Sequence, residues 1–123
     1  MTYHLPFMNM LAPRIDFFTA ADGYRSAVRI WDVDHRIGRV VFLHGIISHG
    51  GWYLASCRAL AQQGLEVHFL DRRGSGLNAV RRGQVDRFET WLDDVEGYLG
   101  QLGSGLPIIL LGISWGGKLA TAV

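Results

Sequence analysis

Three short, mainly apolar runs, each followed by a glycine-containing loop, constrain the fold more than any other feature of the sequence. The runs span residues 39–43, 65–70 and 107–111. Runs of this length and composition are typical of strands buried on both faces of a parallel sheet. Helical apolar spacing at 53–61 and 88–102 separates the runs. Strands that alternate with helices in this way predict a parallel α/β sheet with right-handed crossover connections.

The residues before the first run predict a β-hairpin, and those after the last run predict a helix. Phe17–Thr19 and residues 24–31 are strand-like, and Ala21-Asp22-Gly23 supplies a turn between them. We expect residues 1–15 to be a leader or an irregular segment. Residues 118–123 begin a further helix, and the sequence stops inside this apolar segment. We therefore expect residues 1–123 to be the N-terminal portion of a single larger domain.

Composition narrows the possible partners and compartments. Twelve basic and eleven acidic residues leave a net charge of +1, which argues against a nucleic-acid surface or a polybasic membrane anchor. No apolar run is long enough for a membrane-spanning helix, and no basic region precedes an apolar one as in a secretory signal. The single cysteine, Cys57, excludes an internal disulfide and a thiolate cluster. We expect a cytoplasmic protein without a metal or cofactor.

The sequence Gly112-x-Ser114-x-Gly116 lies between an apolar run and a helix, as a nucleophile elbow requires. A turn this tight needs small residues where backbones approach, and Gly112, Gly116 and Gly117 provide them. Such a turn projects the Ser114 hydroxyl above the carboxyl edge of the sheet. The N–H groups of the following helix point to the same place and favour a developing negative charge. Ser114 is therefore the candidate nucleophile.

The same segment also fits most of a phosphate-binding loop. Residues 112–118 match Gly-x-x-x-x-Gly-Lys, but Leu119 follows where that loop needs a Ser or Thr hydroxyl for magnesium. We therefore favour the elbow, with Lys118 as a solvated helix residue.

A carbonyl oxygen that becomes negative needs two hydrogen-bond donors, and backbone amides are the preorganised choice. The amide of Trp115, directly after Ser114, is one candidate. The loop His44-Gly45-Ile46 follows the first apolar run, and its Ile46 amide is the best candidate for the second donor. The sequence therefore predicts an oxyanion hole made by two loops.

Three motifs in this order resemble the α/β-hydrolase superfamily, and within it the monoacylglycerol lipase and lysophospholipase-like branch, related to the serine aminopeptidases S33. The first motif, His-Gly-x-x-x-His-x-Gly-x-Tyr, is matched by His44, Gly45, His49, Gly51 and Tyr53. The second, Asp-x-x-Gly-x-Gly, is matched by Asp71, Gly74 and Gly76. The third, Gly-x-Ser-x-Gly-Gly, is matched by Gly112, Ser114, Gly116 and Gly117. The resemblance implies the α/β-hydrolase fold, structural roles for His44 and His49, and a loop-anchoring role for Asp71.

The resemblance also implies a triad in the order Ser, then Asp or Glu, then His. Only nine residues follow Ser114, and none of them is acidic or a histidine. We therefore expect the acid and the base beyond residue 123, and no activity from this polypeptide alone.

The remaining polar and reactive side chains have simpler interpretations. Cys57 and His68 are expected in the core, and Asp93 and Asp94 on the solvated side of their helix. Arg72 and Arg73 could meet an anionic substrate, although a surface or salt-bridge role is favoured.

These features predict a serine hydrolase that cleaves carboxylic esters, lipid-like or with small acyl groups, through an acyl-enzyme on Ser114. Its partner would be a small-molecule or lipid ester, and no nucleic acid is expected. Two alternatives stay open: a peptidase or amidase of the same fold, and a hydrolase-like binding module without a working triad.

Overall fold

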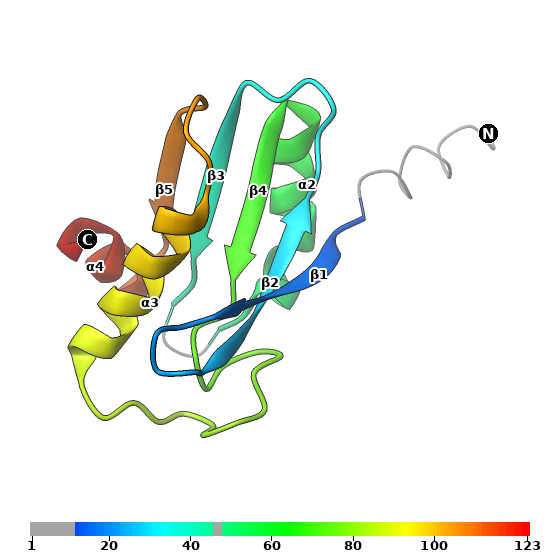
Figure 1. Cartoon of the computed structure of the whole chain (residues 1–123). Helices are drawn as coiled ribbons and strands as arrows, with labels where there is room; N and C mark the ends of the chain where they lie inside the picture. The colour runs from blue at the N-terminus through cyan, green and yellow to red at the C-terminus, as the bar shows by residue number, and fades with distance from the viewer. Residues whose placement is uncertain (1–11, 46–47) are drawn as a thin grey trace.

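The computed structural model describes residues 12–45 and 48–123, which form a five-stranded mixed sheet with helices on both faces (Figure 1). The strands are β1 (Arg14–Thr19), β2 (Arg25–Trp31), β3 (Gly38–Leu43), β4 (Leu65–Leu70) and β5 (Ile108–Gly112). The helices are the 3₁₀ helix η1 (Gly50–Tyr53) and the α-helices α2 (Leu54–Gln62), α3 (Phe88–Gln101) and α4 (Trp115–Ala122). The alternation of strands and helices is as predicted.

The strand order is β1-β2-β4-β3-β5. The hairpin β1–β2 joins the sheet through an antiparallel β2–β4 pair, whereas β3 pairs in parallel with both β4 and β5. The mostly parallel α/β sheet is therefore confirmed. It brings the carboxyl ends of β3, β4 and β5 to one edge, where their three loops meet.

Strand β1 begins inside the segment that we expected to be irregular. Arg14 and Ile15 pair with Ile30 and Arg29 of β2. The Arg14 guanidinium also donates to the Asp32 carboxylate, with Nε 2.6 Å from Oδ2. A strand at the sheet edge can be mostly exposed and polar, so it lacks the apolar run that identifies the central strands.

Alternate residues of the central strands bury opposite faces of the sheet, as the two-residue period of a strand requires. Val41 and Leu43 pack with Val95 of α3 and Leu119 of α4, whereas Phe42 packs toward α2. Figure 1 shows α2 behind the sheet and α3 in front of it. The two apolar layers hold β3 in the middle and fix where its loop begins.

Cys57 and His68 lie in the core, as predicted. The Cys57 side chain is fully buried, and burial raises the pKa of its thiol to about 12. His68 Nε2 donates to Glu66 Oε1 at 2.7 Å, so its Nδ1 accepts from the Tyr98 hydroxyl at 2.6 Å. Both ring nitrogens of His68 are therefore engaged inside the protein.

The prediction that Asp94 is solvated is wrong, because it forms a buried ion pair with Arg73. The Arg73 guanidinium binds both Asp94 oxygens at 2.7 Å and also binds Asp22 in the hairpin turn. Arg73 is only 7% exposed. This arginine therefore joins the hairpin, the end of β4 and α3, and the salt-bridge role predicted for it is confirmed.

No helix in residues 12–45 and 48–123 is both long and apolar enough to cross a membrane.

Candidate active site

Ser114 lies in the turn that joins β5 to α4, at the carboxyl edge of the sheet. Its backbone has φ 57° and ψ −118°. Among the described residues only one other non-glycine residue, Arg81, has a positive φ. A conformation of this kind costs of order 1–3 kcal/mol and persists where the surrounding structure imposes it. The side chain is exposed, so the turn holds a serine hydroxyl in a strained and accessible position.

Two glycines make this turn possible by their lack of a side chain. A Cβ on Gly112 would overlap the Gly116 carbonyl oxygen and lie 2.7 Å from the Gly117 Cα. A Cβ on Gly116 would overlap the Leu43 carbonyl oxygen and lie 2.7 Å from the His44 carbonyl oxygen. Gly117 differs from our expectation, because a Cβ there would meet only the Gly112 oxygen, at 3.7 Å.

The loop after β3 lies directly against this turn. The Ile113 amide donates to the Leu43 carbonyl at 3.1 Å. A Cβ on Gly45 would lie 3.7 Å from the Ser114 Cβ, so the start of the loop faces the serine. The structure thus brings together Gly45, Ser114 and Trp115. Ile46, the predicted second amide donor, lies outside the described residues.

The amides at the start of α4 differ in their partners. The Gly116 amide donates to Ile113 and the Gly117 amide to Ser114, both at 2.9 Å. Trp115 is the first residue of α4, and amides in the first turn of a helix have no acceptor within the helix. The positive end of the helix dipole lies at the same place. The turn can therefore present an amide beside Ser114 to a developing oxyanion.

His44 is held by hydrogen bonds at both ring nitrogens. Its Nε2 accepts from the Arg72 amide at 2.9 Å, so its Nδ1 carries the proton and donates to the Gly45 carbonyl at 2.7 Å. Burial is the main cause that lowers the pKa of His44 to about 4. A neutral ring with both nitrogens engaged supports the structural role that we expected rather than that of a base.

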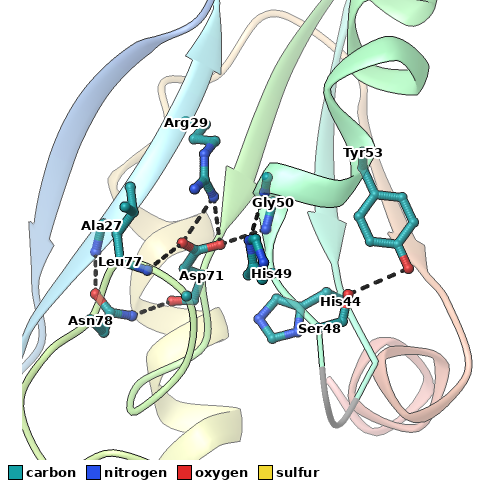
Figure 2. A network of polar contacts seen from close by, with 12 residues as sticks. Ala27, Arg29, His44, Ser48, His49, Gly50, Tyr53, Asp71, Leu77 and Asn78 are labelled. Carbon is teal, nitrogen blue, oxygen red and sulfur yellow. Dashed lines mark hydrogen bonds and ion pairs between the residues drawn. The ribbon is translucent and has the colours of Figure 1, made fainter.

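Asp71 anchors two loops at this edge of the sheet, as Figure 2 shows. Its carboxylate accepts from the Gly50 amide at 2.8 Å, from the Leu77 amide at 2.9 Å and from Arg29 Nη1 at 2.9 Å. A Cβ on Gly76 would overlap this carboxylate. The carboxylate is therefore committed to holding the loops after β3 and β4.

Two further polar residues complete the network in Figure 2. The Asn78 amide donates to the Asp71 and Arg72 carbonyls at 2.7 and 3.0 Å, and it accepts from the Ala27 amide. His49 Nδ1 accepts from the Gly51 amide at 3.0 Å and so caps η1. His49 thus has the structural role that the resemblance implied.

Arg72 is buried, so the surface position that we considered for it is wrong. It is 8% exposed, and its Nη1 lies 3.3 Å from the His44 carbonyl oxygen and 3.2 Å from that of Gly45. Its Cζ lies 4.9 Å from the Trp91 ring centroid and 5.0 Å from that of Trp115. Burial lowers the pKa of this guanidinium. No local sequence signal indicates this environment of Arg72. Arg72 and the groups that it contacts come from four separate segments: the ends of β3 and β4, and the helices α3 and α4.

An open cleft of about 570 Å³ adjoins the loops that Asp71 anchors. Its lining includes Ser48, His49, Trp52, Ser75 and Arg82. Within residues 12–45 and 48–123, no three His, Cys, Asp or Glu side chains are grouped to hold a metal ion.

The chain is similar to known hydrolases in sequence and in structure. It is 32% identical over 110 residues to a monoacylglycerol lipase of Mycolicibacterium smegmatis, covering 85% of this chain and 39% of that protein. It is 29% identical over 91 residues to phospholipase YtpA of Bacillus subtilis, covering 73% of this chain and 35% of that protein. These shares show that the chain spans well under half the length of both relatives.

The solved structures agree with the fold described above. A soluble variant of monoglyceride lipase from Saccharomyces cerevisiae, in complex with a substrate analogue, superimposes with a TM-score of 0.71 at 25% identity. The match covers 87% of this chain and 37% of that one. The family model for serine aminopeptidase S33 matches residues 34–123, which is more than half of the chain. The chain therefore belongs to the serine aminopeptidase S33 family of α/β-hydrolases.

Proposed function

We propose that the full-length protein that carries this chain is a serine hydrolase of carboxylic esters, with Ser114 as its nucleophile. The observation that carries the proposal is the β5–α4 turn, which holds Ser114 at φ 57° with Gly45 packed against it. A strained turn between strand and helix is what exposes the nucleophile in this class of fold.

In the proposed reaction, the Ser114 Oγ attacks the ester carbonyl carbon and its proton passes to a histidine base. The carbonyl oxygen becomes an oxyanion that accepts from the Trp115 amide and from the Ile46 amide. Collapse of this intermediate breaks the bond to the leaving alcohol, which takes the proton from the histidine. Water, which gives a proton to the same histidine, then attacks the acyl carbonyl carbon; the bond to Ser114 Oγ breaks, the carboxylic acid leaves and the histidine returns the proton to Ser114. The histidine and its acidic partner are expected after residue 123, since the nine residues after Ser114 contain neither.

The names of the relatives support lipid-like or small acyl esters as substrates, because two of them are a monoacylglycerol lipase and a phospholipase. The family description, serine aminopeptidase, supports a peptidase or amidase as the second candidate. The single cysteine is a buried thiol, which is consistent with a reducing compartment such as the cytoplasm.

A fluorophosphonate probe tests the nucleophile in the full-length protein. We expect mass spectrometry to locate the label on Ser114, and Ser114→Ala to abolish both labelling and hydrolysis of p-nitrophenyl butyrate. Ser56→Ala, on the exposed face of α2, is the matched control and should change neither. Labelling that persists in Ser114→Ala and maps to Ser48, Ser56 or Ser75 would contradict the assignment.

One pair of substrates separates the candidate enzyme functions. Faster turnover of a monoacylglycerol than of an aminoacyl p-nitroanilide supports the esterase, and the reverse order supports the aminopeptidase. A folded full-length protein that neither reacts with the probe nor turns over either substrate would instead indicate a binding module.

A further inference from the structure

We propose that Arg72 is a positioning residue for the oxyanion hole, because its guanidinium binds the carbonyl of Gly45, which packs against Ser114, and lies over the indole of Trp115, whose amide is a candidate donor. The inference rests on the proposed hydrolase function and adds to it a residue that its motifs do not include. Arg72 would not touch the substrate. It would set the distance between the loop after β3 and the start of α4.

The contacts of Arg72 reach both segments from the end of β4. On one side, its Nη1 donates to the carbonyls of His44 and Gly45, at 3.3 and 3.2 Å. On the other side, its guanidinium lies over the indole of Trp115, with Cζ 5.0 Å from the ring centroid. Trp115 directly follows Ser114, and Gly45 packs against Ser114. One side chain therefore links the two sides of the proposed hole.

The Gly45 carbonyl is held by two donors at once. Its oxygen accepts from Arg72 Nη1 and from His44 Nδ1. A rotation of this carbonyl would break both hydrogen bonds. The two donors therefore hold Gly45 in place, and Gly45 is the residue of this loop that packs against Ser114.

The packing of Arg72 suits an arginine better than a lysine. Its guanidinium lies over the rings of Trp91 and Trp115, which meet edge to face with centroids 4.8 Å apart. A planar guanidinium can stack flat on aromatic rings while the N–H groups along its edge donate hydrogen bonds, and the compact ammonium of lysine lacks this flat, forked shape. We therefore expect lysine to be a poor replacement.

The main chain of Arg72 holds the fold independently of its side chain. Its amide donates to His44 Nε2 at 2.9 Å, and this bond survives any side-chain substitution except proline. Arg73 offers a matched control, because it is equally buried but its guanidinium binds Asp22 and Asp94 instead.

The test compares Arg72→Met, Arg72→Lys and Arg73→Met in the full-length protein, with active sites counted by fluorophosphonate titration. Loss of an oxyanion donor costs about 100-fold or more in kcat, so a misdirected donor in Arg72→Met should cost roughly 10- to 100-fold. KM for p-nitrophenyl butyrate should change less than about threefold, since Arg72 acts in the transition state. Arg72→Lys should recover little of the lost kcat. Arg73→Met should lower the melting temperature but keep kcat per titrated site within about threefold.

The outcomes distinguish this inference from the proposed function. A folded Arg72→Met with kcat within threefold of wild type overturns the positioning role, and so does a raised KM with unchanged kcat. If Arg72→Met does not fold, Arg72→Lys is judged by the same criterion. A wild-type protein that neither labels nor turns over refutes the proposed function, and the positioning role with it.

Discussion

Gly45 at the end of β3 and Ser114 at the end of β5 lie so close that a Cβ on the glycine would be 3.7 Å from the serine Cβ. Their contact follows from the parallel β3–β5 pair, in which Leu43 is opposite Gly112. Parallel pairing brings the two strand ends to the same edge, so the loop and the elbow meet wherever the strands are in register.

The first prediction follows from this contact. Gly45→Val places a branched side chain against Ser114, and we expect turnover by the full-length enzyme to fall by about 100-fold or more, the scale of a lost oxyanion donor. Gly45→Ala is the matched control, because 3.7 Å is an ordinary van der Waals distance, and its loss should be much smaller. A folded Gly45→Val with less than a threefold loss would show that this loop takes no part in the reaction.

The second prediction compares the two neighbouring glycines at the start of α4. Gly116→Ala drives a methyl into the carbonyls of Leu43 and His44, so we expect the free energy of unfolding to fall by roughly 1–3 kcal/mol. Gly117→Ala has room and replaces a helical glycine, so it should be neutral or stabilise by up to about 1 kcal/mol. Urea unfolding of both variants measures the difference, and equal effects would be inconsistent with the close approach of α4 to β3.

The third prediction concerns the buried pair of Arg73 and Asp94. In Asp94→Asn, the buried Arg73 guanidinium keeps an ion pair with Asp22 but loses the one with residue 94. We expect the free energy of unfolding to fall by roughly 3 kcal/mol. Asp93→Asn on the exposed side of α3 is the control and should stay within about 0.5 kcal/mol of wild type. Thermal unfolding distinguishes the two, and similar melting temperatures for both variants would show that the ion pair contributes little.

Asp93 is exposed and Asp94 is buried, and this difference shows which features of the structure can be predicted from the sequence and which cannot. The turn at Ser114 and the strand at 65–70 could be predicted, because local spacing and composition determine them. Asp94 follows Trp91 by three residues and precedes Tyr98 by four, so helical periodicity already places it on the buried stripe. Carboxylates are rarely buried without a partner, so this spacing alone does not predict that Asp94 is buried. Its partner, Arg73, lies on another segment and no local pattern reveals it.

Arg72 is a harder case, because nothing near it in the sequence indicates its environment. Its neighbours Trp91 and Trp115 come from α3 and α4, and its carbonyl acceptors come from the end of β3. Only the tertiary arrangement brings these segments together. The motifs therefore locate the nucleophile, whereas the proposed positioning residue requires the fold.

The fourth prediction is that stability falls as the pH is lowered from 7 to 5, partly through His44. Burial lowers the pKa of His44 from 6.5 to about 4, so between these values the unfolded chain binds a proton that the native protein does not. At pH 5 this difference in proton binding lowers the free energy of unfolding by about 2 kcal/mol. His44→Gln removes the titrating group, so the free energy of unfolding of this variant should fall less between pH 7 and pH 5 than that of wild type. Asp71, Arg72 and His49 are the charged or titratable groups nearest to it. His35→Gln, in an exposed turn, is the control, and an equal pH dependence in His44→Gln and wild type would contradict this role.

The last prediction concerns residues 1–123 produced as a separate polypeptide. Within the described residues β5 pairs with β3 on one side only, and Ile108 and Ile109 are 40% and 48% exposed. An apolar strand with an open edge is a template for pairing with another chain, so we expect this polypeptide to oligomerise or aggregate. Ile109→Lys places a charge on that edge and should reduce the mass measured by light scattering, whereas Ile37→Lys, on an exposed turn, should not. Without a histidine base, Ser114 keeps the weak nucleophilicity of an ordinary hydroxyl, so we expect no esterase activity above a Ser114→Ala control. A monodisperse monomer with Ser114-dependent turnover would contradict both the open-edge argument and the need for a base beyond residue 123.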